Sequence, residues 1–294
     1  MAKRKRRDPY KEFVISNLAQ GAAEVSKKLT EHLRPIYIAN SANEPELIGT
    51  GVLIAVGSHR FLVTAAHVFA QAGGVTFYIP NDASGDLQVL KGQRASSVSN
   101  QLRHKDDVID IAVVWLDTSL ASQFKPSAFV STANINLDDT GDPTRVYIAM
   151  GYPWRKNQKI NRVTRRLRAS IHAYAANILP FNDLAAAGLQ PGSHMMLRYQ
   201  KRHSRTQDGR DVTAPHPHGM SGGPLWRFDP YGAASDITHL VGILIEWKHS
   251  EGGLLAVRMP VVFAAMSCLC PEVADLLPSA NSIKVEILPV SNPS

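Results

Sequence analysis

The sequence predicts an all-β protein of mostly antiparallel strands, arranged either as a β-sandwich or as a pair of β-barrels. From Pro35 onward the chain consists of short apolar runs separated by Gly, Asn, Asp and Pro, a pattern typical of strands joined by turns. Hydrophobic residues make up 44% of the chain and charged residues 19%, as in a globular protein with a packed core. Its 294 residues are enough for one large β domain or two smaller lobes.

The segment before the strands predicts one amphipathic helix. Apolar residues recur at helical spacing between residues 10 and 33, and the sequence RPIY closes the stretch. We expect this apolar stripe to pack against the body of the protein. The residues that form it are Val14, Leu18, Ala22, Val25, Leu29 and Leu33.

The predicted strands follow in order, and a polar loop over residues 203–220 interrupts them. A short helix is predicted over residues 262–277, followed by the apolar run SIKVEILPV. The strands are predicted at PIYIAN, GTGVLIAV, RFLVTAAHVF, VTFYIP, DIAVVWL, RVYIAMGYP, RASIHAYAA, HMMLRYQ, HLVGILIEW and GLLAVRMPVV.

The net charge of +7 is concentrated in two basic stretches. One is the N-terminal run Lys3, Arg4, Lys5, Arg6 and Arg7, and the other is RKNQKINRVTRRLR at residues 155–168. Such runs attract phosphate-rich partners over long range, so contact with nucleic acid or an anionic surface is one reading. No nucleic-acid-binding motif accompanies them, which favours the other reading of solvated arms or exposed strand faces.

The chain is expected to be cytoplasmic. No apolar run approaches the roughly 20 residues that span a bilayer, and no apolar segment follows the basic start as in a signal peptide. The only cysteines, Cys268 and Cys270, are one residue apart and poorly placed to bridge each other. The absence of a disulfide framework fits a reducing compartment.

Three separate segments carry residues suited to nucleophilic catalysis. The stretch HGMSGGPLW surrounds Ser221 with glycines, which either make a plain turn or leave backbone N–H groups bare beside a serine oxygen. His67 follows the strand-like FLVTAA, where an imidazole could serve as base for the serine. Asp110 opens the apolar run IAVVWL, and a buried carboxylate there needs strong donors such as a histidine N–H. Asp106 and Asp107 lie in a solvated charge cluster and are poorer candidates.

The motifs TAAHV, DIAVVWL and GMSGGPL, in the order His, Asp, Ser, resemble those of the trypsin/chymotrypsin-like serine peptidases, over roughly residues 36 to 265. The resemblance implies two antiparallel six-stranded β-barrels with the active site in the crevice between them. It implies that His67 is the general base, Asp110 its orienting partner and Ser221 the nucleophile. The N–H groups of Gly219 and Ser221 would form the oxyanion hole, and no metal or cofactor would be needed.

On this basis the chain divides into four parts: a basic arm and helix over residues 1–35, the first barrel over 36–135, the second over 136–265, and a C-terminal helix and tail over 266–294. Met220 precedes the serine, where animal trypsins have an Asp that pairs with a newly cut N-terminus. We therefore expect activity without N-terminal trimming.

The resemblance also points to substrate-binding residues. Pro215 occupies the place of the acidic group that gives trypsins their Arg/Lys preference, and Glu246 and Trp247 fall on the strand that borders the substrate. Trp247 would narrow the pocket and favour small or medium apolar side chains. Two alternatives stay open: Glu246 could attract a basic residue, and His216 or His218 could attract an acidic one. The two histidines lack a third metal ligand, so pocket lining is favoured for them.

The function expected is an intracellular serine endopeptidase acting on proteins or peptides, with a regulatory partner protein as an open question. One alternative is a non-catalytic binding protein on the same fold, which recognises its partner through the basic arm. Another is a hydrolase of small esters or amides, since the same three side chains can perform that chemistry.

Overall fold

The computed structural model describes nine parts of the chain: residues 20–70, 75–82, 84–97, 107–157, 169–201, 204–205, 211–229, 238–277 and 288–289. The N-terminal basic run and most of the second basic stretch lie outside the described residues, as does the first half of the predicted N-terminal helix. Residues 20–29 are helical and bury Ala22 and Leu29 against the body, as expected. The prediction that the helix extends to Leu33 is wrong, because Leu33 is the first residue of a strand.

The first sheet contains six strands of four or more residues, and three shorter strands extend it to nine. Its order is β17-β6-β7-β3-β2-β1-β4-β5, and β8 runs parallel to β2 at the side. The longer strands are β1 (Leu33–Ala39), β2 (Pro45–Val56), β3 (His59–Ala65), β4 (Phe77–Pro80), β6 (Gly92–Ser96) and β7 (Ile111–Leu116); the short ones are β5 (Leu87–Val89), β8 (Val130–Ser131) and β17 (Leu288–Pro289).

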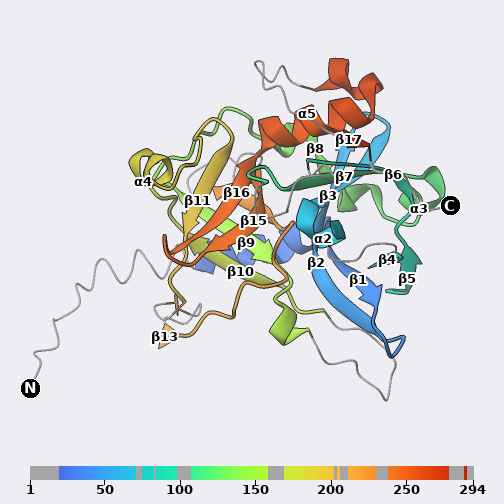
Figure 1. Cartoon of the computed structure of the whole chain (residues 1–294), viewed down its shortest axis with the longest axis horizontal. Coiled ribbons are helices and arrows are strands. Elements are labelled where there is room, and N and C mark those ends of the chain that lie inside the picture. Colours follow the sequence, from blue (N-terminus) through green and yellow to red (C-terminus); the bar gives the residue numbers. More distant parts are fainter. Residues whose placement is uncertain are drawn as a thin grey trace, which may run out of the picture.

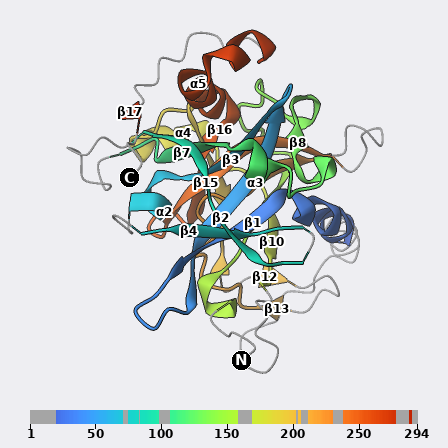
Figure 2. The same cartoon turned by 90° about the vertical axis from the view of Figure 1, so that its right-hand side faces the viewer.

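The second sheet has six antiparallel strands in the order β10-β9-β14-β15-β16-β11. They are β9 (Val146–Gly151), β10 (His172–Ala176), β11 (His194–Arg198), β14 (Pro224–Phe228), β15 (Thr238–Lys248) and β16 (Gly253–Arg258), and a separate pair is formed by β12 (Ser204–Arg205) and β13 (Asp211–Val212). Figure 1 shows this sheet on the left and the first sheet on the right, while Figure 2 faces the first sheet. Both sheets curl, which confirms the predicted pair of antiparallel β-barrels.

One apolar core joins the two sheets. Strands rich in β-branched and aliphatic residues bury Ile54 and Val63 of the first sheet in the same cluster as Ile243 and Val257 of the second. The helix α5 (Met259–Leu269) lies across both sheets at the top of Figure 1. The shared core and the α5 contacts hold the two sheets at a fixed relative position, because a close-packed interior is hard to deform.

The predicted C-terminal helix over residues 262–277 is wrong in its bounds. The α-helix begins at Met259 and ends at Leu269, and a 3-10 helix, η7 (Pro271–Leu276), follows it. Pro271 explains the break, since a proline disfavours the helical conformation of the residue before it. Cys270 there has φ −134° and ψ 89°.

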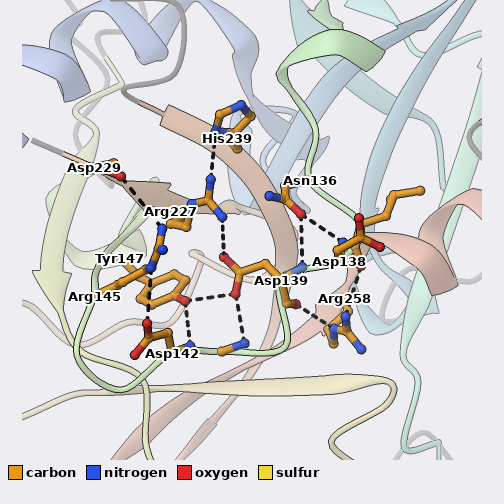
Figure 3. A network of polar contacts seen from close by, with 12 residues as sticks. Asn136, Asp138, Asp139, Asp142, Arg145, Tyr147, Arg227, Asp229, His239 and Arg258 are labelled. Atoms are coloured by element: carbon orange, nitrogen blue, oxygen red, sulfur yellow. Dashed lines mark hydrogen bonds and ion pairs between the residues drawn. The ribbon is translucent and has the colours of Figure 1, made fainter. Parts of the chain in front are cut away.

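A polar network around Asp139 stabilises the segment between β8 and β9, which connects the two sheets (Figure 3). The Asp139 carboxylate accepts hydrogen bonds from the Tyr147 hydroxyl and from the Gly141 N–H, both at 2.9 Å, and pairs with Arg227 at 3.4 Å. Its backbone carbonyl accepts a bond of 3.0 Å from Nε of the buried Arg258. These bonds hold the connection at one end of the second sheet.

The remaining helices are short. They are η1 (Thr30–His32), α2 (Ala66–Ala70), α3 (Thr118–Ala121), η3 (Pro126–Ala128), η4 (Thr132–Asn134), η5 (Trp154–Lys156) and α4 (Phe181–Ala186). No helix in the described ranges is long and apolar enough to cross a membrane.

Candidate active site

His67 lies where β3 passes into the short helix α2. The last five residues of β3 are buried, so the strand anchors the chain in the first sheet up to Ala65. His67 then comes at the edge of the core, with a quarter (25%) of its side chain exposed. An imidazole in this position is held firmly and still reaches solvent or a substrate.

Asp110 holds both the ring and the backbone of His67. Its Oδ2 lies 2.6 Å from His67 Nδ1, and its Oδ1 accepts a 2.8 Å hydrogen bond from the His67 backbone N–H. The Asp110 carbonyl accepts a further bond of 2.9 Å from the N–H of Ala66. A carboxylate accepts only, so Nδ1 carries a proton here and Nε2 points to the opposite side of the ring.

The Asp110 carboxyl is buried, with 11% of its side chain exposed. Burial raises the pKa of Asp110, and the hydrogen bonds from His67 act in the opposite direction. Its backbone has φ +46°, a left-handed conformation that Asp tolerates better than most residues. This conformation turns the chain immediately before β7 and directs the side chain back toward α2.

Ser221 lies in a tight turn in front of β14. Met220 N–H donates to the Pro217 carbonyl at 2.8 Å, and Gly219 has φ +91°. His218 is not among the described residues with positive φ, so the turn is type II, which needs glycine at its third position. A Cβ on Gly219 would also lie 2.5 Å from the Tyr152 carbonyl oxygen, so glycine is required for space as well.

The turn leaves two backbone N–H groups free beside the serine. The His218 carbonyl accepts a 2.8 Å bond from Trp154 N–H, and the Met220 carbonyl accepts one of 2.9 Å from Gly223 N–H. In a trans peptide the N–H points opposite to the carbonyl, so the N–H groups of Gly219 and Ser221 point away from these partners. Neither N–H has a hydrogen-bond partner within the described residues. A pair of unpaired donors of this kind suits a developing oxyanion.

The three predicted side chains line one cavity of about 730 Å³. No hydrogen bond joins Ser221 Oγ to His67 among the residues that the structure describes. Both sheets contribute to the walls, as expected for a crevice between them. The lining residues are His67, Asp107, Val108, Asp110, Leu189, His216, Pro217, His218, Met220, Ser221, Leu244, Ile245, Glu246, Trp247, Lys248, Leu254 and Leu255.

Four of the five predicted substrate-binding residues line this cavity, and Pro215 does not. The Pro215 carbonyl instead accepts a 2.5 Å bond from the hydroxyl of Tyr199. Glu246 forms an ion pair of 2.6 Å with Lys248, and about half (51%) of its side chain is exposed. The carboxylate therefore lies beside a cation on its own strand, in a pair that solvent reaches.

The rings of His216 and Trp247 meet edge to face, with centroids 4.8 Å apart. Backbone N–H of His218 donates to His216 Nδ1 at 3.2 Å, which makes Nδ1 an acceptor. Burial lowers the pKa of His216, and the nearby positive groups Lys201 and Arg155 lower it further. No set of three or more His, Cys, Asp or Glu side chains in the described ranges could hold a metal ion.

Sequence reasoning missed Thr50, which reaches the serine loop from the first sheet. Its hydroxyl donates a 2.8 Å hydrogen bond to the Gly219 carbonyl. The available signal was the GTG motif, since glycines inside a strand mark close approaches. A Cβ on Gly49 would lie 2.7 Å from the methyl groups of Val68, and one on Gly51 would lie 3.0 Å from the Leu62 side chain.

Comparisons with known proteins show what this chain is similar to. A family model described as a trypsin-like peptidase domain matches residues 49–232. Among solved structures, the serine endoprotease from Yersinia pestis matches at 17% sequence identity with a TM-score of 0.49, over 85% of this chain and 67% of that chain. No curated protein matches the sequence.

Proposed function

The chain belongs to the family of trypsin-like peptidase domains and is a serine endopeptidase, and from this premise we propose that Ser221, His67 and Asp110 form its catalytic triad. The observation that carries the proposal is that Asp110 accepts hydrogen bonds from both the backbone N–H and the ring Nδ1 of His67, in a cavity that Ser221 also lines. Geometry of this kind orients an imidazole as a base toward a neighbouring hydroxyl.

In the proposed reaction, His67 Nε2 takes the proton of Ser221 Oγ as this oxygen attacks the carbonyl carbon of the scissile peptide bond. The N–H groups of Gly219 and Ser221 donate to the oxyanion of the tetrahedral intermediate. The imidazolium then protonates the leaving amine, and the acyl group stays on Ser221. Water, activated by His67, releases the acid in the same way. Asp110 keeps Nδ1 protonated throughout and stabilises the charged ring.

A fluorophosphonate probe tests this assignment, because it reacts with an activated serine and not with an ordinary one. We expect covalent labelling at Ser221 in the natural protein and a large loss of labelling in His67→Ala. Ser119, an exposed hydroxyl on α3, gives a matched control in Ser119→Ala, which should label as the natural protein does. Intact protein that is not labelled at Ser221 would contradict the proposal.

We also propose that the residue before the scissile bond has a small or medium apolar side chain. The edge-to-face contact of His216 with Trp247 supports this, since the two rings occupy space on the wall of the cavity beside Ser221. Apolar residues make up much of the remaining lining, including Leu244, Leu254 and Leu255. The ion pair with Lys248 argues against Glu246 as a site for a basic side chain.

An intracellular setting remains our proposal for the compartment. Cys268 is exposed and Cys270 is buried, and both are free thiols. An exposed free thiol suits a reducing compartment, where it is not driven into disulfides. Fractionation of cells that express the full chain tests this, and recovery outside the cell would contradict it.

A further inference from the structure

Thr50 contacts the serine loop and its surroundings with both its hydroxyl and its backbone N–H. It lies on β2 and is fully buried, at 0% exposure. Its hydroxyl donates to the Gly219 carbonyl at 2.8 Å and accepts from Tyr152 N–H at 3.0 Å. Its backbone N–H donates to the Ser221 carbonyl at 2.9 Å. One residue of the first sheet thus contacts three residues at the active-site end of the second.

The neighbouring strand provides no donor for the Thr50 carbonyl. The partner of Thr50 in β1 is Pro35, which has no N–H to donate across the ladder. The Thr50 carbonyl accepts a bond of 2.7 Å from the Thr64 hydroxyl instead. A Cβ on Gly222 would lie 2.0 Å from the Thr50 carbonyl oxygen, so glycine at this position lets the serine loop approach β2.

Thr50 bonds to the peptide between the two oxyanion donors and to the peptide that follows them. The N–H of Gly219 belongs to the peptide 218–219 and the N–H of Ser221 to the peptide 220–221. Thr50 holds the peptide between them, 219–220, and the one that follows, 221–222, through their carbonyls. Trp154 N–H and Gly223 N–H hold the carbonyls of the two donor peptides. Four successive peptides are therefore fixed, two of them by a single residue.

We propose that Thr50 is a positioning residue, which sets the direction of the Gly219 and Ser221 N–H groups from the first sheet. The inference rests on the proposed role of these groups as the oxyanion hole. Its hydroxyl fixes the Gly219–Met220 peptide and ties it to Tyr152 at the end of β9. The contacts between the two sheets therefore orient the oxyanion hole in the chain as it folds.

The test compares Thr50→Val with Thr50→Ser. Valine has the shape of threonine without its hydroxyl, so it leaves the Gly219 carbonyl and the Tyr152 N–H without their partner. We expect kcat on a peptide substrate to fall on the order of 10- to 100-fold, with KM changed by less than about threefold, because the oxyanion forms only after binding. Thr50→Ser keeps the hydroxyl and should stay within about threefold of the natural kcat.

Tyr147→Phe is a matched control for loss of a buried hydroxyl. This hydroxyl also donates one bond, to Asp139, and accepts one from a backbone N–H, that of Asp142, each at 2.9 Å (Figure 3). Tyr147 lies near the far end of β9 from Tyr152. The control should lower Tm as Thr50→Val does and leave kcat unchanged.

The outcomes separate this inference from the proposed function. Equal kcat in Thr50→Val and natural protein would overturn the role of Thr50, as would an equal loss in Tyr147→Phe. Natural protein that neither cleaves peptides nor labels at Ser221 would overturn the proposed triad. If Thr50→Val does not fold, Thr50→Ala measured against Thr50→Ser makes the same comparison of hydroxyl with no hydroxyl. Equal kcat in that pair would overturn the inference.

Discussion

Asp110 binds His67 through two different groups, accepting from the ring Nδ1 at 2.6 Å and from the backbone N–H at 2.8 Å. The same carboxylate therefore sets the orientation of the imidazole and the start of helix α2. Because Asp110 itself has φ +46°, its side chain reaches back to the chain that precedes it in the sheet. Substitutions at Asp110 thus act on catalysis and on local structure in separable ways.

Asp110→Asn should reduce kcat by roughly 10⁴-fold while the protein stays folded. Asn tolerates the left-handed conformation and can still accept from the His67 N–H. Its amide would favour the wrong His67 tautomer, with Nδ1 unprotonated. Steady-state kinetics and a thermal melt measure the two effects. A double variant with Ser221→Ala should be no worse than Ser221→Ala alone, since the residues act as a unit. Turnover by Ser221→Ala at the natural rate would contradict the assignment.

Cleavage should occur without a cut near the N-terminus. Met220 is 1% exposed within the apolar cluster of the second sheet, so this position has no carboxylate that could pair with the amino group of a newly cut N-terminus. A cut within β1 (Leu33–Ala39) would also remove a strand that pairs with β2. Intact-mass measurement before and after the assay checks this expectation. Activity that begins only after cleavage between residues 30 and 50, with the new amine buried, would contradict it.

Trp247→Ala should widen the preference for the residue before the scissile bond. Removing the indole takes away its contact with His216 and leaves room for larger apolar side chains, with a gain on the order of tenfold for Phe or Leu. A peptide-library profile measures this. Glu246→Gln is the control and should leave the profile unchanged, because the Glu246 carboxylate is paired with Lys248. Dominant cleavage after Arg or Lys that is lost in Glu246→Gln would point to Glu246 as the specificity group.

Stability should fall in mild acid because of His172. Burial lowers the pKa of His172 from 6.5 to about 4, and its Nε2 is buried without a hydrogen-bond partner among the described residues. The unfolded chain binds a proton near pH 6.5 and the folded chain only near pH 4, so the free energy of unfolding falls as the pH drops from 6.5 toward 4. The loss is at most about 1.4 kcal/mol per pH unit in this window. Urea unfolding of natural protein and of His172→Phe at several pH values measures this loss. If the free energy of unfolding changed with pH equally in the two proteins, the prediction would be contradicted.

Removal of residues 1–7 should leave hydrolysis of a small neutral peptide within about twofold of the natural rate. The run carries five positive charges, whose long-range attraction has no target in such a substrate. Binding of an acidic partner through this run would weaken steeply with salt. Kinetics of the shortened and full chains in low and high salt test both statements. A large loss of peptide hydrolysis on shortening would mean that the run completes the active site.

The strand pattern and the order of His67, Asp110 and Ser221 could be read from the sequence, because both are local properties. Alternation and turn residues identify strands, and each of the three residues is marked by its neighbours: FLVTAA before His67, IAVVWL after Asp110 and glycines around Ser221. The family motifs then predicted the pair of barrels. Strand counts alone left a sandwich open, since they do not say how sheets close.

Tertiary structure decided what depends on residues far apart in the chain. Thr50 and Gly219 are separated by 169 positions, and their hydrogen bond exists only because the two sheets pack in one register. The contact of His216 with Trp247, 31 positions apart, likewise follows from side-chain directions that no motif specifies. Sequence by itself determined which chemical groups this protein has at its site; the packing of the two sheets determined which of them are held, paired or left free for a substrate.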